Sequence, residues 1–365
     1  MSNHSGGHTI TIKAAVLRHK NLPLELESLE MEGPRDDEVL VRMVASGICH
    51  TDIDFRDDWN GDAVVLGHEG AGVVEQVGNN VKSVRRGDHV VLSYQSCGHC
   101  SQCLNGHPAH CEYFWQANFG FQRLDGSNAL QRSGVSGHFF GQSSFATHSL
   151  ATERNIVKIS KNLPLEILAP MGCGLQTGAG TVMNSLRVSP GDSIAVFGTG
   201  AVGLASIMAA RLEGAAPIIG IDIIPKRLKL ALKLGATHAI NRCRQDVATR
   251  IAEITGGRVD YVIESTGDQK MHQLAIDVLN SHGIAALLTG ETGVNSLSRG
   301  RKSLGIIQGD AVPQYFIPKL IKLYQAGLFP FVSMLKFYDF NMINQAIADA
   351  KNGDTIKPVL KISAS

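Results

Sequence analysis

The segment from Ser193 to Gly214, SIAVFGTGAVGLASIMAARLEG, constrains the fold more than any other part of the sequence. Ser193–Phe197 is an apolar run of strand length, Leu204–Leu212 is an apolar run of helix length, and the residues between them match G-x-G-x-x-G. In this order of strand, turn and helix, the glycines allow a tight turn, let a pyrophosphate approach the backbone and let the helix pack on the strand. The segment therefore predicts a dinucleotide site, with these contact residues: Gly198, Gly200, Ala201, Val202 and Gly203.

The run PIIGIDI follows as a second strand and places Asp222 near its end, nineteen residues beyond Gly203. An acid about 20 residues after the glycines accepts a hydrogen bond from the ribose 2′-hydroxyl and repels a 2′-phosphate. Asp222 therefore favours NAD over NADP, although Lys226 and Arg227 lie just downstream and could favour the phosphate. Asp222 could also cap the helix that Pro225 begins, and both roles can hold at once.

Further apolar runs at Asp260–Ser265 and Gly283–Gly290 alternate with helical segments. This alternation predicts an α/β fold with a Rossmann-type, doubly wound parallel sheet. Residues 12–160 are instead rich in glycine, valine and short alternating runs such as VLVRMV, and indicate a mostly-β domain to which the final KPVLKIS returns as a strand. A chain of 365 residues exceeds what one core usually serves. We expect a catalytic domain at 1–174, a nucleotide-binding domain at 175–310 and a return to the first domain at 311–365.

Four of the seven cysteines lie close together, at Cys97, Cys100, Cys103 and Cys111. Two-residue gaps let the chain wrap one ion with three thiolates, and the longer gap brings a fourth thiolate from the returning chain. Zinc prefers four such ligands in a tetrahedron. Because protein fills every position, the spacing predicts a closed, structural zinc site.

Two alternatives stay open for this loop. The thiols could be ordinary or paired in a disulfide, which a reducing cytoplasm disfavours. They could instead hold an iron–sulfur cluster, but ferredoxin-type runs close with three residues and a proline after the fourth cysteine, whereas Glu112 follows Cys111 here. His99, His107 and His110 lie inside the loop, and we interpret them as solvated residues that are not ligands.

A second metal site is suggested by Cys49, His68 and Cys173. Two thiolates and one imidazole leave an open position for water or substrate, which is the arrangement of a catalytic zinc. Spacing alone does not link residues that lie this far apart in the sequence. Asp52 and Glu69 are both candidates for the carboxylate that orients a ligating histidine.

Composition excludes several classes of function. The formal net charge of +1 indicates no surface for a polyanion, so nucleic acid is not an expected partner. The N-terminal MSNHSGGHTITIK lacks the apolar core of a signal peptide. Ile194–Ala210 carries no charge, but glycines interrupt it and it is short for a bilayer core of roughly 30 Å. We therefore expect a cytoplasmic protein without a membrane partner.

Together these motifs resemble the zinc-dependent medium-chain alcohol dehydrogenases. The resemblance rests on the four-cysteine loop, CHTD, GHEGAGVVEQVG, GCGLQTGAG and GTGAVG, and covers the chain from about residue 12 to its end. Within the family, LSYQSCGHC, HFFGQSSFATHSLA, MGCGLQTGAG and GLFPF are most similar to the aryl-alcohol (benzyl alcohol) and geraniol dehydrogenases. The resemblance implies that the mostly-β catalytic domain is GroES-like.

The resemblance also implies roles for single residues. Cys49, His68 and Cys173 match the ligands of a catalytic zinc, and the four clustered cysteines match those of a structural zinc, which makes two zinc ions per subunit. The other matches are Asp52, which orients the ligating histidine; Glu69, a carboxylate just behind the zinc; Thr51, whose hydroxyl touches the substrate oxygen; His50 and Lys357, near the cofactor pyrophosphate; Asp222, the ribose acid; and Arg227, beside the adenosine. Cys243 matches no functional position.

One position departs from the family pattern. Many members end the proton relay with a histidine three residues after the hydroxyl residue, and Asp54 stands there in this chain. Asp54 could accept the proton itself, or the proton could leave through the cofactor ribose to water. The rings of YFWQANFGFQRL and HFF could line an apolar pocket for an aromatic or allylic alcohol, but we expect most of them to pack the core.

The resemblance thus implies an NAD-dependent zinc alcohol dehydrogenase that oxidises a primary aromatic or allylic alcohol reversibly to its aldehyde. The alternatives are a polyol or glutathione-adduct dehydrogenase on the same scaffold, and a non-enzymatic zinc protein that senses NADH or redox state. An open metal position argues against a sensor, which has no need of one. Family members assemble through the nucleotide domain, so we expect a homodimer or homotetramer that acts on a small-molecule alcohol or aldehyde.

Overall fold

The computed structural model describes residues 9–289 and 298–364, which form two compact units. The first unit comprises the described parts of Met1–Cys173, Val312–Pro318 and Met334–Ser365, and the second those of Gly174–Ala311 and Lys319–Ser333. Residues 319–333 thus group with the second unit, whereas the sequence analysis placed them in the first. The chain passes from one unit to the other inside helix α10, Pro313–Gln325.

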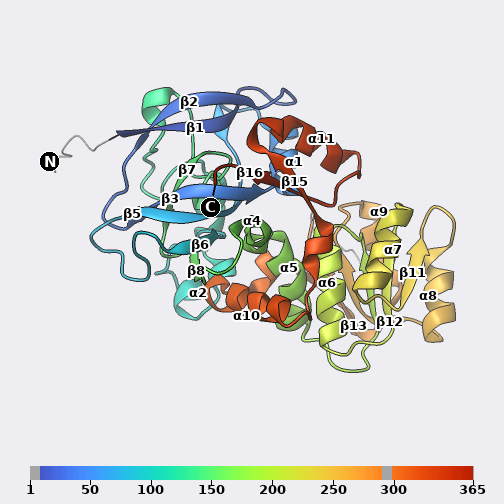
Figure 1. Cartoon of the computed structure of the whole chain (residues 1–365). Helices are drawn as coiled ribbons and strands as arrows, with labels where there is room; N and C mark the ends of the chain where they lie inside the picture. Colours follow the sequence, from blue (N-terminus) through green and yellow to red (C-terminus); the bar gives the residue numbers. More distant parts are fainter. Residues whose placement is uncertain (1–8, 290–297, 365) are drawn as a thin grey trace. The chain divides into compact units, whose positions relative to one another are not determined.

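The first unit is built on two β-sheets (Figure 1). The smaller sheet has the order β2-β1-β4, and the larger has the order β15-β16-β3-β5-β6-β8, with β7 also paired to β3. All of these pairs are antiparallel except β15 with β16. The strands are β1 Thr9–Leu17, β2 Glu25–Glu32, β3 Glu38–Gly47, β4 Val64–Val65, β5 Glu69–Val77, β6 His89–Leu92, β7 His148–Thr152, β8 Ile156–Ile159, β15 Leu335–Asp339 and β16 Lys357–Lys361.

The strand predicted from KPVLKIS is β16, and it pairs with β3 in the first unit, as expected. Short helices connect the strands of this unit. They are α1 His50–Asp58, α2 Ser101–Leu104, α3 Phe114–Phe119, α4 Leu165–Leu168 and α11 Ile343–Lys351, with 3-10 turns at Pro108–His110, Gln131–Ser133, Phe139–Gly141, Ala169–Gly172 and Phe340–Met342. Helix α1 was not predicted, because only Asp52 and Ile53 of its nine residues are buried and its sequence has no apolar stripe.

The second unit contains a six-stranded sheet in which every pair of strands is parallel. Its order, β11-β10-β9-β12-β13-β14, is the 3-2-1-4-5-6 order of the Rossmann fold. The strands are β9 Ile194–Phe197, β10 Ile218–Asp222, β11 His238–Asn241, β12 Val259–Glu264, β13 Leu279–Leu287 and β14 Lys302–Gly305. The predicted α/β fold with a doubly wound sheet is therefore confirmed.

Helices cover both faces of this sheet. Ile219 and Ile221 of β10 pack in one core with residues of α8 and α9. Gly220 between them faces α6 and α7, because a Cβ on Gly220 would lie next to Ile207 and Ala231. Neighbouring residues of a strand point to opposite faces, so the two helix pairs lie on opposite sides. The helices are α5 Gly174–Gly180, α6 Ala201–Leu212, α7 Pro225–Leu234, α8 Val247–Thr255 and α9 Gln269–Asp277, with a π-helical turn at Thr181–Leu186 and 3-10 turns at Gln308–Asp310 and Phe331–Met334.

The predicted strand–turn–helix at Ser193–Gly214 is observed as β9 and α6. The helix begins three residues earlier than predicted, since Gly200 is its N-cap and Ala201 already has helical backbone. The strand predicted at Gly283–Gly290 begins earlier, at Leu279, and Gly290 lies outside the described residues. No helix in the described ranges combines the length and the apolar character needed to cross a membrane.

Candidate active site and metal centres

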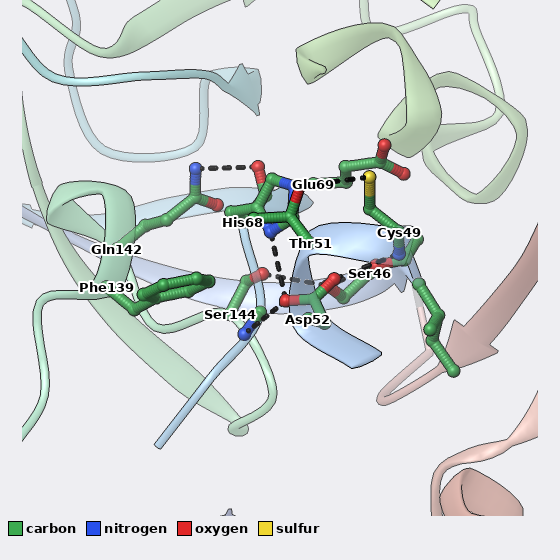
Figure 2. Close-up of polar contacts among 12 residues, drawn as sticks. Ser46, Cys49, Thr51, Asp52, His68, Glu69, Phe139, Gln142 and Ser144 are labelled. Atoms are coloured by element: carbon green, nitrogen blue, oxygen red, sulfur yellow. Dashed lines mark hydrogen bonds and ion pairs between the residues drawn. The ribbon is translucent and has the colours of Figure 1, made fainter. Parts of the chain in front are cut away.

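The N-terminus of α1 and the start of β5 bring together the first group of predicted site residues (Figure 2). The Asp52 carboxylate accepts a hydrogen bond from the backbone N–H of Cys49 at 2.9 Å and another from that of Gly67 at 3.1 Å. Its Oδ1 also accepts from Nδ1 of His68 at 2.9 Å. Asp52 and His68 are both fully buried. Asp52 thus fixes the backbone beside Cys49 and the ring orientation of His68 together, as predicted for a carboxylate that orients a ligating histidine.

Cys173 completes this group from the chain segment before α5. One ligand atom each from Cys49, His68, Glu69 and Cys173 lies within 4.8 Å of the others. Because Nδ1 of His68 is bound to Asp52, the ring offers Nε2, which is buried and has no hydrogen-bond partner among the residues that the structure describes. Two sulfurs and an imidazole nitrogen are ligands that zinc accepts. An unpartnered, buried Nε2 among sulfurs therefore fits a metal ion at this position.

The charges around the group favour a bound cation. Hydrogen bonding with Cys173 lowers the pKa of Cys49 well below its usual range, and His68 and Lys357 reinforce this against the effect of burial. Burial alone would lower the pKa of His68, but the Asp52 carboxylate and Cys49 outweigh it and raise this pKa to about 10. A thiol that ionises easily and a strongly basic imidazole are both better metal ligands.

Glu69 lies in the same group and is held by Lys357 of β16. The Lys357 Nζ donates to both carboxylate oxygens of Glu69 at 2.7 Å and to the carbonyl of Ile48 at 3.1 Å, and both side chains are buried. Burial would lower the pKa of Lys357, but the charges of Glu69, Cys49 and Cys173 raise it above its usual value. Gly47 makes room for this pair, since a Cβ there would lie 2.0 Å from Glu69 Oε2.

This ion pair was not predicted. The sequence analysis placed Lys357 near the cofactor pyrophosphate, and the structure shows its ammonium already bound to a buried carboxylate beside the candidate metal ligands. Lys357 is separated from Glu69 by 288 positions, and no local pattern joins them. Only the return of the last strand to the sheet of β3 brings the two side chains together.

Three polar residues of α1 lie next to this group. The Thr51 hydroxyl is 3.7 Å from the Cys49 sulfur, which places it beside the candidate metal position. His50, the first residue of α1, is exposed, as is Asp54. Partial burial raises the pKa of Asp54, while the charge of His50 opposes this increase. The structure thus leaves Thr51 and Asp54 on the same helix, three residues apart.

Aromatic side chains pack against His68. The ring of Phe140 stacks on the imidazole at a centroid distance of 4.4 Å, and the ring of Phe139 meets it edge-on at 5.6 Å. Phe139 in turn stacks on Phe121 at 5.2 Å. These rings and Phe114 are buried, which confirms for them the expectation of core packing, whereas Trp115 is 68% exposed.

A buried glutamine near these rings was missed by sequence reasoning. The amide of Gln142 donates to the carbonyl of His68 at 3.0 Å (Figure 2). It also donates to the carbonyl of Ser93 at 2.9 Å and accepts from the N–H of Gly70 at 3.1 Å. It therefore fixes the backbone on both sides of Glu69. A glutamine between the phenylalanines of HFFGQSSF was the signal that could have indicated it.

The four clustered cysteines form a second group, with Sγ atoms within 4.8 Å of one another. Cys97 and Cys103 sulfurs are 3.9 Å apart, as are those of Cys100 and Cys111, and all seven cysteines of the chain are free thiols, so the disulfide alternative is wrong. Gly98 and Gly106 supply the turns of this loop, and both have φ of 81°. His99, His107 and His110 are exposed and outside the group, as predicted.

Backbone N–H groups point at these sulfurs. Those of Cys97 and Cys100 donate to the sulfurs of Cys111 and Cys97, each at 3.3 Å. Burial opposes ionisation of Cys100, but N–H groups of Cys103 and Glu112 outweigh it and lower its pKa to about 6. Four sulfurs close enough to bind one ion fill all four positions of a tetrahedron and match a closed zinc site.

The glycine turn of the second unit shows the geometry of a dinucleotide site. Gly198 has φ of 87°, and a Cβ at Gly203 would lie 1.9 Å from the Gly198 carbonyl, so helix and strand can pack only with glycine there. A Cβ at Gly200 would meet nothing within 4 Å, so the N-terminus of α6 faces open space. Backbone N–H groups exposed at a helix N-terminus bind phosphate, and the turn therefore fits a pyrophosphate.

The predicted ribose acid, Asp222, ends β10 and is buried beside this turn. Its carboxylate accepts hydrogen bonds from Thr199 and from the N–H groups of Ile223 and Ile224. It therefore shapes the turn before α7. The predicted cap is wrong, because the N-cap of α7 is Ile224 and no side chain in the described ranges caps this helix. Arg227 lies in the first turn of α7. Cys243 is exposed in the turn after β11, outside both groups of candidate ligands.

Comparison with known proteins identifies the class. The chain matches the alcohol dehydrogenase GroES-like domain over residues 35–161 and the zinc-binding dehydrogenase domain over residues 201–316. It is 42% identical, over 96% of its length and 98% of the relative's, to the geraniol dehydrogenase of Castellaniella defragrans.

Two crystal structures are also similar over nearly the whole chain. An alcohol dehydrogenase zinc-binding domain protein from Burkholderia ambifaria is 49% identical with a TM-score of 0.94, covering 98% of this chain and all of that one. The benzyl alcohol dehydrogenase of Acinetobacter calcoaceticus is 45% identical with a TM-score of 0.93, covering 97% of this chain and all of that one.

The chain belongs to the zinc-dependent medium-chain alcohol dehydrogenases. It is an alcohol dehydrogenase that acts on small-molecule alcohols with zinc as its metal, and its two groups of candidate ligands fit that metal.

Proposed function

We propose that the chain oxidises primary aromatic or allylic alcohols reversibly to aldehydes with NAD, and that Cys49, His68 and Cys173 hold the catalytic zinc while the four clustered cysteines hold a structural one. The observation that carries the proposal is the group of two sulfurs and an unpartnered imidazole nitrogen with two phenylalanine rings packed against it. Similarity to a geraniol and a benzyl alcohol dehydrogenase supports the substrate class.

Zinc at this position supplies a Lewis acid that lowers the pKa of an alcohol hydroxyl. Around it, Asp52 holds His68 in one tautomer and orientation through the 2.9 Å hydrogen bond. Glu69 and Lys357 form a neutral, buried pair beside the ligands, so that the charge of Glu69 is compensated by the chain itself. Phe139 and Phe140 exclude water from one side of the His68 ring.

A proton must leave the alcohol before hydride transfer. Thr51 Oγ1, 3.7 Å from the Cys49 sulfur, is placed to accept a hydrogen bond from the substrate hydroxyl; as it takes up that proton it releases its own hydroxyl proton to the next acceptor. Asp54, one turn further along α1, has a raised pKa and is a candidate for the next acceptor, in the position where many family members have histidine. Bound NAD supplies the hydride acceptor, and the glycine turn with Asp222 is where we place its pyrophosphate and ribose.

Steady-state kinetics on benzyl alcohol, geraniol, sorbitol and S-(hydroxymethyl)glutathione, each with NAD and NADP, test the proposal. We expect kcat/KM with NAD to be highest for benzyl alcohol or geraniol, because a conjugated product aldehyde forms more easily. Highest kcat/KM with sorbitol or the glutathione adduct would refute the substrate class. Preference for NADP would refute the cofactor.

A further inference from the structure

Asp222 receives an unusual set of hydrogen bonds for a residue that is expected to bind a ribose. Its Oδ1 accepts from two consecutive backbone N–H groups, those of Ile223 at 2.7 Å and Ile224 at 2.9 Å. Its Oδ2 accepts twice from one residue, from the N–H of Thr199 at 2.7 Å and from the hydroxyl of Thr199 at 2.8 Å. The chain therefore holds both oxygens of the carboxylate at the end of β10.

Three of these four donors are backbone N–H groups, which remain when a side chain is replaced. The Thr199 hydroxyl is the only side-chain donor among them. Thr199 is the first variable residue of the G-x-G-x-x-G pattern, and its side chain is completely buried. It contacts the same strand at Gly220, where a Cβ would lie 3.3 Å from Thr199 Cγ2. The hydroxyl thus joins the glycine turn to the strand that carries the ribose acid.

We propose that Thr199 is a positioning residue for cofactor selectivity, and this inference rests on the proposed use of NAD. The paired donors of Thr199 hold Oδ2 of Asp222, while the N–H groups of Ile223 and Ile224 hold Oδ1, so the carboxylate is oriented before the cofactor arrives and less ordering cost falls on binding. The carboxylate discriminates by accepting from a ribose hydroxyl and by repelling a 2′-phosphate. Both effects depend on where its charge lies.

The surroundings of Asp222 make this positioning necessary. Lys226 and Arg227 follow in the first turn of α7, and within the described part of the chain the Nε of Arg227 is buried without a hydrogen-bond partner. These cations favour a 2′-phosphate. Without the hydrogen bond from the Thr199 hydroxyl, the Asp222 carboxylate would discriminate less well against a 2′-phosphate near these side chains. The preference between NAD and NADP therefore depends on the Asp222 carboxylate against the two cations, and the Thr199 hydroxyl shifts this preference toward NAD.

The test compares Thr199→Val with Thr199→Ser. Valine keeps the shape and the backbone N–H but removes the hydroxyl, whereas serine keeps the hydroxyl. Titration calorimetry of the zinc-loaded protein gives Kd for NADH and for NADPH without any turnover. For Thr199→Val we expect Kd for NADH to rise about tenfold, as for loss of a hydrogen bond to a charged group, and Kd for NADPH to change by less than about twofold. Thr199→Ser is expected to retain the wild-type ratio.

Thr181→Val is the matched control for loss of a buried hydroxyl. Thr181 lies in the same unit, is equally buried, and donates to the Thr177 carbonyl at 2.7 Å, away from Asp222. It is expected to leave the ratio of the two Kd values unchanged, which separates positioning from general destabilisation. If Thr199→Val does not fold, Thr199→Ala removes the same hydroxyl and carries the same expectation.

The outcomes separate this inference from the proposed function. A wild-type protein that binds NADPH more tightly than NADH overturns the proposed cofactor and the inference with it. A wild-type protein that prefers NADH, with an unchanged ratio in Thr199→Val, overturns the inference alone. Tighter NADH binding by Thr199→Val also overturns it, because the hydroxyl would then compete with the ribose for Oδ2.

Discussion

Replacing Asp52 with asparagine tests how the catalytic zinc is held. The carboxylate accepts from three N–H groups, those of Cys49 at 2.9 Å, Gly67 at 3.1 Å and the His68 ring at 2.9 Å. Asparagine has nearly the same shape, but one of its two arms is a donor. In either orientation of the amide, at least one buried N–H faces another donor, and the bond to His68 loses its charge assistance.

The size of the effect follows from these contacts. A hydrogen bond to a charged partner contributes about 1.5–3 kcal/mol, and every 1.4 kcal/mol is about tenfold in an equilibrium constant. Removing a carboxylate behind a ligating histidine typically weakens metal binding about 10- to 100-fold. We therefore expect Asp52→Asn to bind one of its two zinc ions about 10- to 100-fold more weakly, with a parallel loss of kcat/KM for the alcohol.

Zinc transfer to a chromogenic chelator measures this directly, and the chain carries its own control. The ion held by Cys97, Cys100, Cys103 and Cys111 has no contact with Asp52 in the described structure, so its affinity should match the wild type. The reasoning fails if both ions of Asp52→Asn are held as tightly as in the wild type, or if the ion of the four-cysteine group is the one that loosens.

Three further predictions concern ionisable side chains. Lys357→Met leaves Glu69 buried without its cation, which costs about 3–5 kcal/mol. The melting temperature should therefore fall in this variant and recover in the double variant Lys357→Met/Glu69→Gln. An unchanged melting temperature in the single variant would contradict the buried pair. Burial and the charges of Arg123 and Arg35 lower the pKa of His138 from 6.5 to about 3. The folded protein therefore loses stability as the pH falls from 6.5 toward 3, by about 1.4 kcal/mol per pH unit, because the unfolded chain binds a proton that the folded protein does not. His138→Gln should flatten the dependence of melting temperature on pH, and the same dependence in the variant and the wild type would contradict this role of His138. Asp54→Asn should shift the pH profile of kcat/KM if Asp54 takes part in the relay, and superimposable profiles would exclude it.

The sequence predicted the parts of the fold whose signals are local. The glycine turn between two apolar runs specified β9 and α6, because the run before the turn has the length of a buried strand and the run after it has the length of a helix. The short spacing of the four cysteines likewise specified one group of sulfurs. The resemblance was needed to join Cys49, His68 and Cys173, which come from separate segments of the chain.

The unpredicted features depend on contacts between distant segments. Lys357 and Glu69 meet only because β16 pairs with β3, which in turn pairs with β5. Gln142 reaches the backbone of His68 across 74 positions. Helix α1 has no apolar periodicity and is fixed by its N-terminal carboxylate, Asp52, which binds its own N-cap and His68 together. Periodicity identifies elements that bury an apolar face, and these polar contacts leave no such pattern.

The central claim is that each chain holds two zinc ions in different settings. Metal analysis of purified, active protein and of the variants Cys49→Ala and Cys103→Ser tests it most directly. We predict two zinc ions per chain in the wild type and one in each variant, with activity abolished in Cys49→Ala and stability reduced chiefly in Cys103→Ser. Active wild-type protein that contains no zinc, or iron in its place, would contradict the account.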